Sequence, residues 1–252
     1  MSTADIAGGV AAIQERIGAA CARSGRKADE VRLMAVSKFH SRDAVEAAWN
    51  AGVRLFGESR VREAAEKFED IKEDRPGMEL HMIGTLQRNK AKAAVSLFDC
   101  VQSVDRDELI AELGKLAASR QKPGFLQGQK PLGILLELNA GEESKSGYAD
   151  EDDLFRGAEQ VLSWPNLVLR GLMIMAPFTT DTALIRRAFR SLGDVQRKLE
   201  TRFPEADWSC LSMGMSGDFE IAIEEGSTLV RVGTAIFGER QTGGLLTGGS
   251  LP

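Results

Sequence analysis

The sequence is poor in the residues that usually build metal centres and disulfide frameworks. It holds only two histidines and three cysteines, and Cys21, Cys100 and Cys210 lie far apart without any C-x-x-C pair. Zinc sites and disulfide scaffolds need such residues in closely spaced sets. The sequence therefore predicts no metal centre, and its cysteines are typical of reduced thiols in a cytoplasmic protein.

Long apolar runs and clustered positive charge are lacking as well. No stretch approaches the roughly 20 apolar residues of a membrane-spanning helix, and the N-terminus lacks the basic and apolar segments of a signal peptide. The formal net charge is −5, whereas nucleic-acid surfaces need clustered lysine and arginine. We therefore expect a cytoplasmic protein that binds neither membranes nor nucleic acid.

Short apolar runs alternate with longer amphipathic segments along the chain. Ile6, Val10, Ile13, Ile17 and Cys21 recur at three- and four-residue steps and predict an extra N-terminal helix. Eight strands are predicted after it, at residues 32–37, 53–56, 80–83, 100–103, 132–138, 168–174, 208–211 and 229–232. Helices are predicted between them, at residues 41–51, 60–71, 106–118, 150–162, 182–202 and 219–224. This alternation, in a chain of 252 residues, favours a single (β/α)8 TIM-type barrel, with an open doubly wound sheet as the alternative.

No break in composition divides the chain, so one domain is predicted over residues 1–240. Residues 121–130 are predicted to form a surface loop before the fifth strand. The last residues, 241–252, read QTGGLLTGGSLP and are predicted to be a flexible, glycine-rich tail.

Lys38 is the first candidate for chemistry. It ends the apolar strand that contains Met34 and Val36, and functional groups of parallel barrels gather at the carboxyl ends of the strands. Burial lowers a lysine's preference for the charged form, and the neutral amine is the nucleophile that forms Schiff bases. The alternative is a lysine whose ammonium group simply reaches water.

Glycines and hydroxyls follow the seventh and eighth predicted strands, and a helix is predicted to begin near Asp218. Glycine-rich turns and helix starts bind phosphate through unpaired N–H groups, and barrels often place a phosphate site at these two loops. The residues concerned are Ser212, Gly214, Ser216, Gly217, Gly233 and Thr234. They could also be ordinary turn formers, but together with Lys38 they favour a phosphorylated ligand.

Arg231 precedes Gly233 by two residues, so both face the same side of an extended strand. Its alternative role is an ion pair with a carboxylate of a neighbouring loop. The pattern alone assigns Met34, Ile83, Met173 and Met175 to the core. His40, His81 and the single tyrosine, Tyr148, have no evident orienting partner in the sequence and are not assigned to catalysis.

At these residues the chain resembles the pyridoxal phosphate homeostasis protein family, the YggS/PROSC group, over about residues 33–240. The matching segments are AVSK at 35–38, FGES at 56–59, HMIGTLQRNK at 81–90, SVD at 103–105, ESKSG at 143–147, LSMGMSGDFEIAI at 211–223 and GSTLVRVGTAIFGER at 226–240. That family is in turn similar to the N-terminal barrel of alanine racemases.

The resemblance implies pyridoxal 5′-phosphate (PLP) as cofactor, bound as a Schiff base to Lys38. It implies Ser212, Ser216, Gly233 and Thr234 around the phosphate, Arg231 beside the pyridine nitrogen, and Ile83 near the ring. Ser59 stands where the family usually has asparagine, and a hydroxyl reaches less far toward the cofactor. Arg62, Leu80 and Thr85 also depart from the family pattern, at the rim of the expected site.

Two functions of different classes follow from this resemblance. The first is a PLP carrier in cellular PLP homeostasis, expected to be a monomer without substantial amino-acid turnover and to serve PLP-dependent apo-enzymes. The second is a PLP-dependent amino-acid racemase. The first is favoured because racemase barrels rely on a second domain with a catalytic tyrosine, and here the sequence ends soon after the eighth strand. A Schiff-base aldolase would suit the phosphate loops but leaves Arg231 unexplained.

Overall fold

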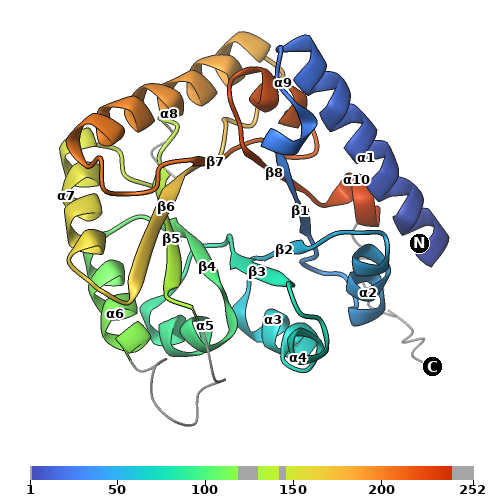
Figure 1. Ribbon diagram of the computed structural model, residues 1–252, viewed down its shortest axis with the longest axis horizontal. Helices are drawn as coiled ribbons and strands as arrows, with labels where there is room; N and C mark the ends of the chain where they lie inside the picture. The colour runs from blue at the N-terminus through green and yellow to red at the C-terminus, as the bar shows by residue number, and fades with distance from the viewer. Residues whose placement is uncertain (1, 119–129, 142–145, 240–252) are drawn as a thin grey trace, which may run out of the picture.

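Eight parallel strands close into a barrel in the computed structural model, which describes residues 2–118, 130–141 and 146–239 (Figure 1). Each strand pairs with its neighbours in chain order, and β8 pairs with β1. The strands are β1 Arg32–Val36, β2 Leu55–Glu58, β3 Glu79–Met82, β4 Cys100–Val104, β5 Leu132–Leu138, β6 Leu167–Ile174, β7 Cys210–Ser212 and β8 Leu229–Val232. The predicted (β/α)8 barrel is confirmed, and the open sheet is excluded.

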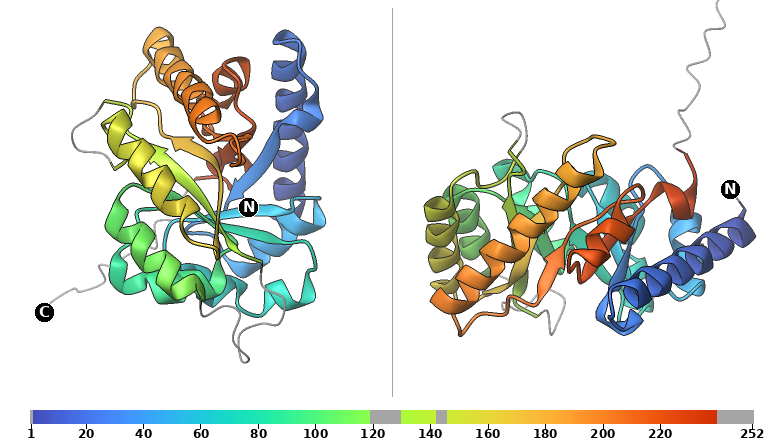
Figure 2. Two further views of the ribbon diagram at one scale, coloured as in Figure 1. Left: turned by 60° about the vertical axis from the view of Figure 1, so that its left-hand side comes forward. Right: turned by 90° about the horizontal axis from the view of Figure 1, so that it is seen from above.

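Helices surround the barrel and separate consecutive strands, as the two views of Figure 2 show. They are α1 Thr3–Arg23, α2 Arg42–Asn50, α3 Val61–Phe68, α4 Ile71–Asp74, α5 Ala91–Leu97, α6 Asp107–Ala117, α7 Glu151–Leu162, α8 Thr182–Arg202, α9 Phe219–Glu224 and α10 Thr234–Phe237. Two 3-10 turns, η1 Ala28–Glu30 and η2 Arg88–Lys90, complete the described elements.

The extra N-terminal helix is α1, and it lies against α2, α9 and α10 (Figure 1). Its predicted apolar stripe from Ile6 to Cys21 is buried. The Ser2 hydroxyl and the Asp5 carboxylate form a capping box at its start, which satisfies N–H groups that a helix leaves unpaired. A side chain at Gly9 would come within 3.0 Å of the Ile236 carbonyl oxygen. The helix therefore approaches the end of the barrel that carries α10.

Two apolar cores hold the molecule together. The larger one fills the layer between the strands and the helices and includes Phe56, Leu80, Val101 and Ile134. Smaller clusters fill the inside of the barrel, where Met34, Val36, Leu55 and Leu229 form one group and Cys100, Leu135 and Met173 form another. Because strand residues alternate between the two sides, these inner clusters identify which residues of each strand face the barrel axis.

The structure differs from the predicted elements in several places. The short helix α10 was not predicted, and β7 begins at Cys210 instead of residue 208. Helix α5 was not predicted, because its buried residues are mostly alanines that give little apolar contrast. The helix predicted over 60–71 is divided into α3 and α4. Strand β2 begins two residues later than predicted and includes polar Glu58, since that carboxylate has buried partners.

No described helix has an apolar stretch long enough to cross a lipid bilayer. Within the described residues no group of three or more His, Cys, Asp or Glu side chains could hold a metal ion. The predicted tail, 241–252, and nearly all of the predicted loop, 121–130, lie outside the described residues.

Candidate functional site

Lys38 lies two residues beyond the end of β1, at the carboxyl-terminal end of the barrel. Met34 and Val36 belong to an inner cluster, and the backbone N–H of Ser37 still bonds to the carbonyl of Gly57 on β2. The pairing with β2 therefore continues through Ser37, and Lys38 begins the turn that follows it. The residue is half-buried, and its role as the cofactor lysine stays a prediction.

A buried ionic cluster fixes the backbone on both sides of Lys38. The Lys67 ammonium on α3 bonds to the Glu58 carboxylate at 2.7 Å, to the Glu63 carboxylate at 2.9 Å and to the Ser37 carbonyl at 2.8 Å. The Ser37 hydroxyl donates to Glu58 at 2.7 Å. Glu63 in turn accepts from the N–H of Phe39, which has a φ of 68°, uncommon for a non-glycine residue.

This cluster escaped the sequence analysis because Lys67 and Glu63 are one turn apart on an ordinary amphipathic helix. Their role becomes visible only when α3 packs beside β1 and β2. Removing one charge from such a buried cluster leaves its partner uncompensated and destabilises the fold. The same cluster therefore stabilises the barrel and holds the backbone next to Lys38. Burial raises the pKa of Glu58, while the Lys67 ammonium opposes that rise.

Ser59 and Ile83 follow on the neighbouring strands. A side chain at Gly57 would meet Met34 Sδ at 2.6 Å and Ile83 Cδ1 at 3.2 Å, which places both residues around the same point of the axis. Ile83 is half-buried and packs on the inner cluster of Met34. Ser59 is also half-buried, and a Cβ at Gly84 would clash with its carbonyl oxygen at 2.4 Å. The ends of β1, β2 and β3 therefore converge closely.

The loops after β7 and β8 present unpaired backbone N–H groups. Within the described residues, the amides of Ser216, Gly217, Thr234 and Ala235 donate no hydrogen bond. Ser216 Oγ accepts a 3.4 Å bond from the N–H of Gly233, which joins the two loops. Unpaired amides on converging loops attract an anion. The structure thus brings together the residues that were predicted to surround a phosphate, apart from Ser212.

Register also relates these loops to Lys38. β1 pairs with β8 through Ala35 and Val232, and a Cβ at Gly233 would lie 3.0 Å from the carbonyl oxygen of Val36. Gly233 therefore lies beside the strand position two residues before Lys38. The lysine and the N–H-rich loops belong to one end of the barrel.

Arg231 is buried, with 5% of its surface exposed. Its Nη1 donates to the Ser212 carbonyl at 2.6 Å and to the Ser212 hydroxyl at 2.7 Å, and Nη2 donates to the Ile174 carbonyl at 2.8 Å. No carboxylate of the described chain lies within ion-pair distance of Arg231, so the alternative of a direct ion pair is not formed there, although the Asp218 carboxylate in the loop after β7 opposes the fall of the Arg231 pKa. Burial lowers the pKa of Arg231 to about 10, which leaves the guanidinium charged at neutral pH.

Of the five guanidinium N–H groups that an arginine carries, three are accounted for by these bonds. Nε and one N–H of Nη2 have no partner among the described residues. The carboxylates of Asp218 and Glu137 act on this cation from beyond ion-pair distance, but buried N–H donors without an acceptor are costly unless a ligand supplies one.

Ser212 is fully buried and is engaged by the protein itself. Its hydroxyl accepts from Arg231 and donates to Gln102 Oε1 at 2.7 Å. These bonds favour a role in holding Arg231, and its predicted contact with the phosphate stays a prediction. Gln102, on β4, was missed by the sequence analysis because nothing in its neighbourhood marks it as inward-facing and polar.

Glu137 is a second residue that the sequence did not single out. It lies on β5 with 1% of its surface exposed, and the Ser146 hydroxyl donates to its Oε1 at 2.9 Å. Its Oε2 has no hydrogen-bond partner among the described residues. Burial raises the pKa of Glu137 to about 7, so at neutral pH this carboxyl group exists in both protonation states.

His40, His81 and Tyr148 do have partners in the folded protein. His40 stacks on Phe237 with ring centroids 4.9 Å apart, and His81 Nδ1 lies 2.8 Å from Gln102 Nε2. The Tyr148 hydroxyl donates to Asp107 at 3.3 Å. Tyr148 belongs to the core between strands and helices, which keeps the chain's single tyrosine away from the barrel axis.

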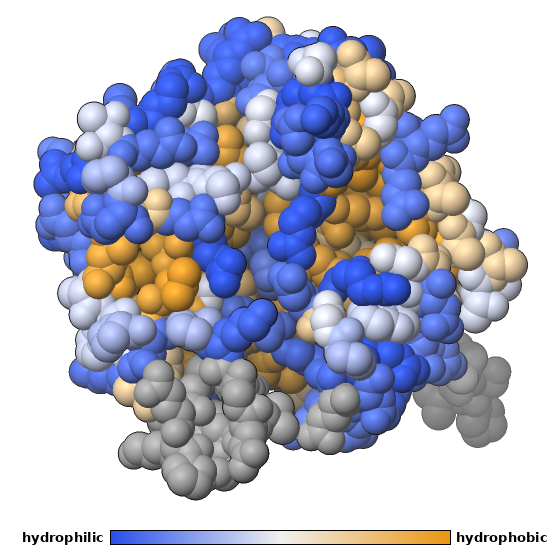
Figure 3. All heavy atoms as spheres, in the orientation of Figure 1, coloured by the Kyte–Doolittle hydropathy of each residue, from blue (hydrophilic) through white to orange (hydrophobic). Residues whose placement is uncertain are grey.

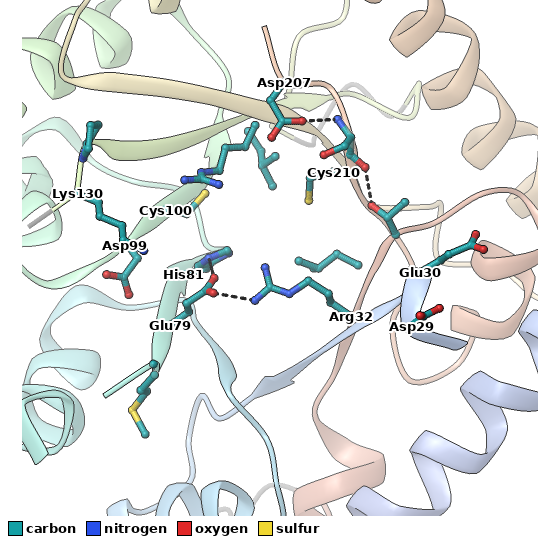
Figure 4. A pocket seen from close by; sticks show the side chains of 18 of the residues that line it. Asp29, Glu30, Arg32, Glu79, His81, Asp99, Cys100, Lys130, Asp207 and Cys210 are labelled. Carbon is teal, nitrogen blue, oxygen red and sulfur yellow. Dashed lines mark hydrogen bonds and ion pairs between the residues drawn. The ribbon is translucent and has the colours of Figure 1, made fainter. Parts of the chain in front are cut away.

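A large cavity of about 960 Å³ lies at the other, amino-terminal end of the strands. Figure 4 shows Arg32 directed at Glu79, with His81 beside Glu79, and Cys100 and Cys210 also line the cavity. Its charges are largely paired, with Arg32 to Glu79 at 3.0 Å and Lys72 to Asp99 at 2.7 Å. In the space-filling view of Figure 3, hydrophilic side chains cover much of the face, with apolar residues between and behind them.

The family model of the alanine racemase N-terminal domain matches residues 10–241. The pyridoxal phosphate homeostasis protein of Vibrio cholerae is 41% identical over 231 residues, which is 90% of this chain and 93% of that protein. The solved structure of PipY from Synechococcus elongatus PCC7942 with PLP bound is 34% identical and has a TM-score of 0.76. The match covers 90% of this chain and 100% of PipY.

Alanine racemase from E. faecalis shares the fold at 16% identity and a TM-score of 0.66. The match covers 95% of this chain and 59% of the racemase. The homeostasis proteins, by contrast, match over nearly their whole length. From its sequence and its fold, the chain belongs to the pyridoxal phosphate homeostasis protein family.

Proposed function

We propose that this protein binds PLP at the carboxyl-terminal end of its barrel through Lys38 and serves intracellular PLP homeostasis without substantial amino-acid turnover. The observation that carries the proposal is Arg231, a buried cation with spare N–H donors and no carboxylate partner in the described chain. Its place at the same end as Lys38 and the N–H-rich loops fits a ligand that has an aldehyde, a ring acceptor and a phosphate. The PLP-bound structure of PipY supports the choice of ligand.

The residues present fit the cofactor at three points. Lys38 supplies the amine that can condense with an aldehyde. The amides of Ser216, Gly217, Thr234 and Ala235 can bind the phosphate, together with the Ser216 and Thr234 hydroxyls. Arg231 can donate to the pyridine nitrogen with an N–H group that has no partner among the described residues. Ser59 and Ile83 are the neighbours proposed for the ring.

Arg231 also supports the proposal that turnover is low. When bound, PLP supplies an electron sink, which works best when its pyridine nitrogen is protonated. A guanidinium has no acceptor atom, and it stays charged at neutral pH, so Arg231 cannot hold a shared proton as an aspartate or glutamate would. Tyr148 adds to this, because its hydroxyl is engaged by Asp107 outside the barrel axis.

The binding half of the proposal is tested by borohydride reduction of purified protein loaded with PLP, followed by peptide mapping. The label is expected on Lys38. Label found only on Lys90, which is exposed near the mouth, or on Lys145, which lies outside the described residues, would contradict it.

The low-turnover half is tested by incubating the loaded protein with L-alanine, L-serine or L-lysine in deuterated water and following α-proton exchange by NMR. Little or no exchange is expected. Exchange at about 1 s⁻¹ or faster, near the low end of ordinary enzyme turnover, would favour the racemase instead. Transfer of PLP to a PLP-dependent apo-enzyme would support the carrier role, and size-exclusion chromatography tests the proposed monomer.

A further inference from the structure

A continuous line of hydrogen bonds crosses the inside of the barrel, starting from Arg231. Arg231 Nη1 donates to Ser212 Oγ at 2.7 Å, and Ser212 Oγ donates to Gln102 Oε1 at 2.7 Å. Gln102 Nε2 lies 2.8 Å from His81 Nδ1, and His81 Nε2 lies 3.5 Å from Glu79 Oε2. The line therefore runs from β8 through β7, β4 and β3 to the wall of the amino-terminal cavity. Figure 4 shows its outer end, His81 and Glu79.

The donor and the acceptor of every hydrogen bond in this line follow from the guanidinium of Arg231. A guanidinium can only donate, so Ser212 Oγ accepts from Arg231 and gives its own proton to Gln102 Oε1. The amide nitrogen of Gln102 then faces His81 and donates to Nδ1. His81 must consequently carry its single proton on Nε2, which points to Glu79. One arrangement of the protons satisfies all of the groups.

The line is closed off from water over most of its length. Gln102 and Ser212 have no exposed surface, and Arg231 and His81 are 5% and 6% exposed. Burial also lowers the pKa of His81, which keeps the ring neutral at pH 7 and Nδ1 free to accept. Glu79 and Arg32 hold the outer end through their 3.0 Å ion pair. Buried polar networks of this kind are retained where they specify one arrangement.

We propose that Gln102 and His81 are positioning residues for the pyridine nitrogen of PLP, acting through Ser212 and Arg231. Gln102 holds the Ser212 hydroxyl as an acceptor for Arg231, and His81 holds the Gln102 amide in the matching orientation. The bonds of Nη1 thereby fix the orientation of the guanidinium. Its remaining N–H groups, on Nε and Nη2, then keep one position from which they can donate to the pyridine nitrogen. This inference rests on the proposed function, since it requires PLP beside Arg231.

The experiment compares PLP with 1-deaza-PLP, the analogue in which the ring nitrogen is replaced by a C–H group. Affinities of both are measured by equilibrium titration for wild type, Gln102→Leu, His81→Leu and His81→Asn. Wild type is expected to prefer PLP by about tenfold, the range of one charge-assisted hydrogen bond. In Gln102→Leu and His81→Leu that preference should fall to about twofold or less, mostly through weaker binding of PLP.

His81→Asn is the conservative control, because its amide oxygen can replace Nδ1 as the acceptor for Gln102. It should keep most of the preference for PLP that His81→Leu loses. Thermal unfolding of each variant shows whether it is folded, and the ratio of the two affinities is unaffected by a general loss of folded protein.

Equal weakening of both ligands in the leucine variants would mean that Gln102 and His81 act only on stability, and would overturn the inference. A wild type that binds PLP and its deaza analogue equally would overturn it too, while leaving PLP binding intact. A wild type that binds neither ligand would instead overturn the proposed function.

Discussion

The two ends of this barrel differ in how their polar groups are matched. At the amino-terminal end a cavity of about 960 Å³ is lined by charges that largely pair with one another, such as Arg32 with Glu79 and Lys72 with Asp99. At the carboxyl-terminal end, three kinds of group have no partner among the described residues: Arg231 lacks a contacting carboxylate, Glu137 Oε2 lacks a hydrogen bond, and loop amides are unpaired.

The largest described cavity and the unpaired polar groups therefore lie at different ends of the barrel. Most charges of the large cavity are paired by its own walls, so a ligand there would have to compete with existing ion pairs. The carboxyl-terminal end holds donors and a buried charge that the described protein does not satisfy, and unsatisfied buried groups are the costly ones. We therefore propose that the ligand binds at the end with unmatched groups.

The largest expected effect is on stability, from Lys67→Met at the carboxyl-terminal end. The change removes the buried cation shared by Glu58 and Glu63 and should lower the free energy of unfolding by about 3–5 kcal/mol. The matched change at the other end is Lys72→Met, whose partner Asp99 is 42% exposed, and it should cost about 1 kcal/mol or less. Urea denaturation measures both, and equal losses would remove the contrast.

Glu137→Gln should change stability in a pH-dependent way. The pKa of Glu137 is raised by burial from 4.5 to about 7, so the folded state holds a proton that the unfolded state releases between those values. Stability is therefore lost as pH rises from about 4.5 to about 7 and stays lower above that window.

The amide of Glu137→Gln carries no charge at any of these pH values. Glu137→Gln should match wild type at pH 4.5 and exceed it by up to roughly 3 kcal/mol at pH 8, at about 1.4 kcal/mol per pKa unit. Urea denaturation at the two pH values measures this difference. A gain that is the same at both would show that Glu137 is ionised throughout.

The double change Ser216→Ala and Thr234→Val tests the predicted phosphate loops. It should weaken PLP about tenfold or more, because charge-assisted hydrogen bonds contribute roughly 1.5–3 kcal/mol each. Pyridoxal, which lacks the phosphate, should lose much less. Ser209→Ala removes a hydroxyl from the amino-terminal cavity and serves as the matched control. Equal losses for PLP and pyridoxal would place the phosphate elsewhere.

The smallest effect is expected from Arg170→Ala. Arg170 lines the amino-terminal cavity and makes no hydrogen bond or ion pair with the described residues, so it is the cavity's most available cation. PLP affinity should change less than twofold in this variant. A loss of tenfold would show that the phosphate is bound at the amino-terminal end, against the contrast drawn above.

Much of the fold could be predicted from the sequence. The stripe from Ile6 to Cys21 and the alternation of apolar runs with amphipathic segments are local patterns, and they indicated α1 and eight strands. Alanine-rich α5 escaped because its buried face differs little in hydropathy from its exposed face. Strand ends shifted by up to two residues because pairing with both neighbours fixes them, and the pairing partners are distant in the chain.

The sequence by itself determined Lys38, Ser216, Arg231, Gly233 and Thr234 as candidates, since each follows or ends a strand whose apolar pattern is readable locally. Only the tertiary structure decided what supports them. Lys67 reaches Glu58, and Gln102 reaches both Ser212 and His81, across strands and helices that are far apart in the chain. Closure of the barrel creates these contacts, because it brings inward-facing polar side chains into a space without water, where they must bond to one another.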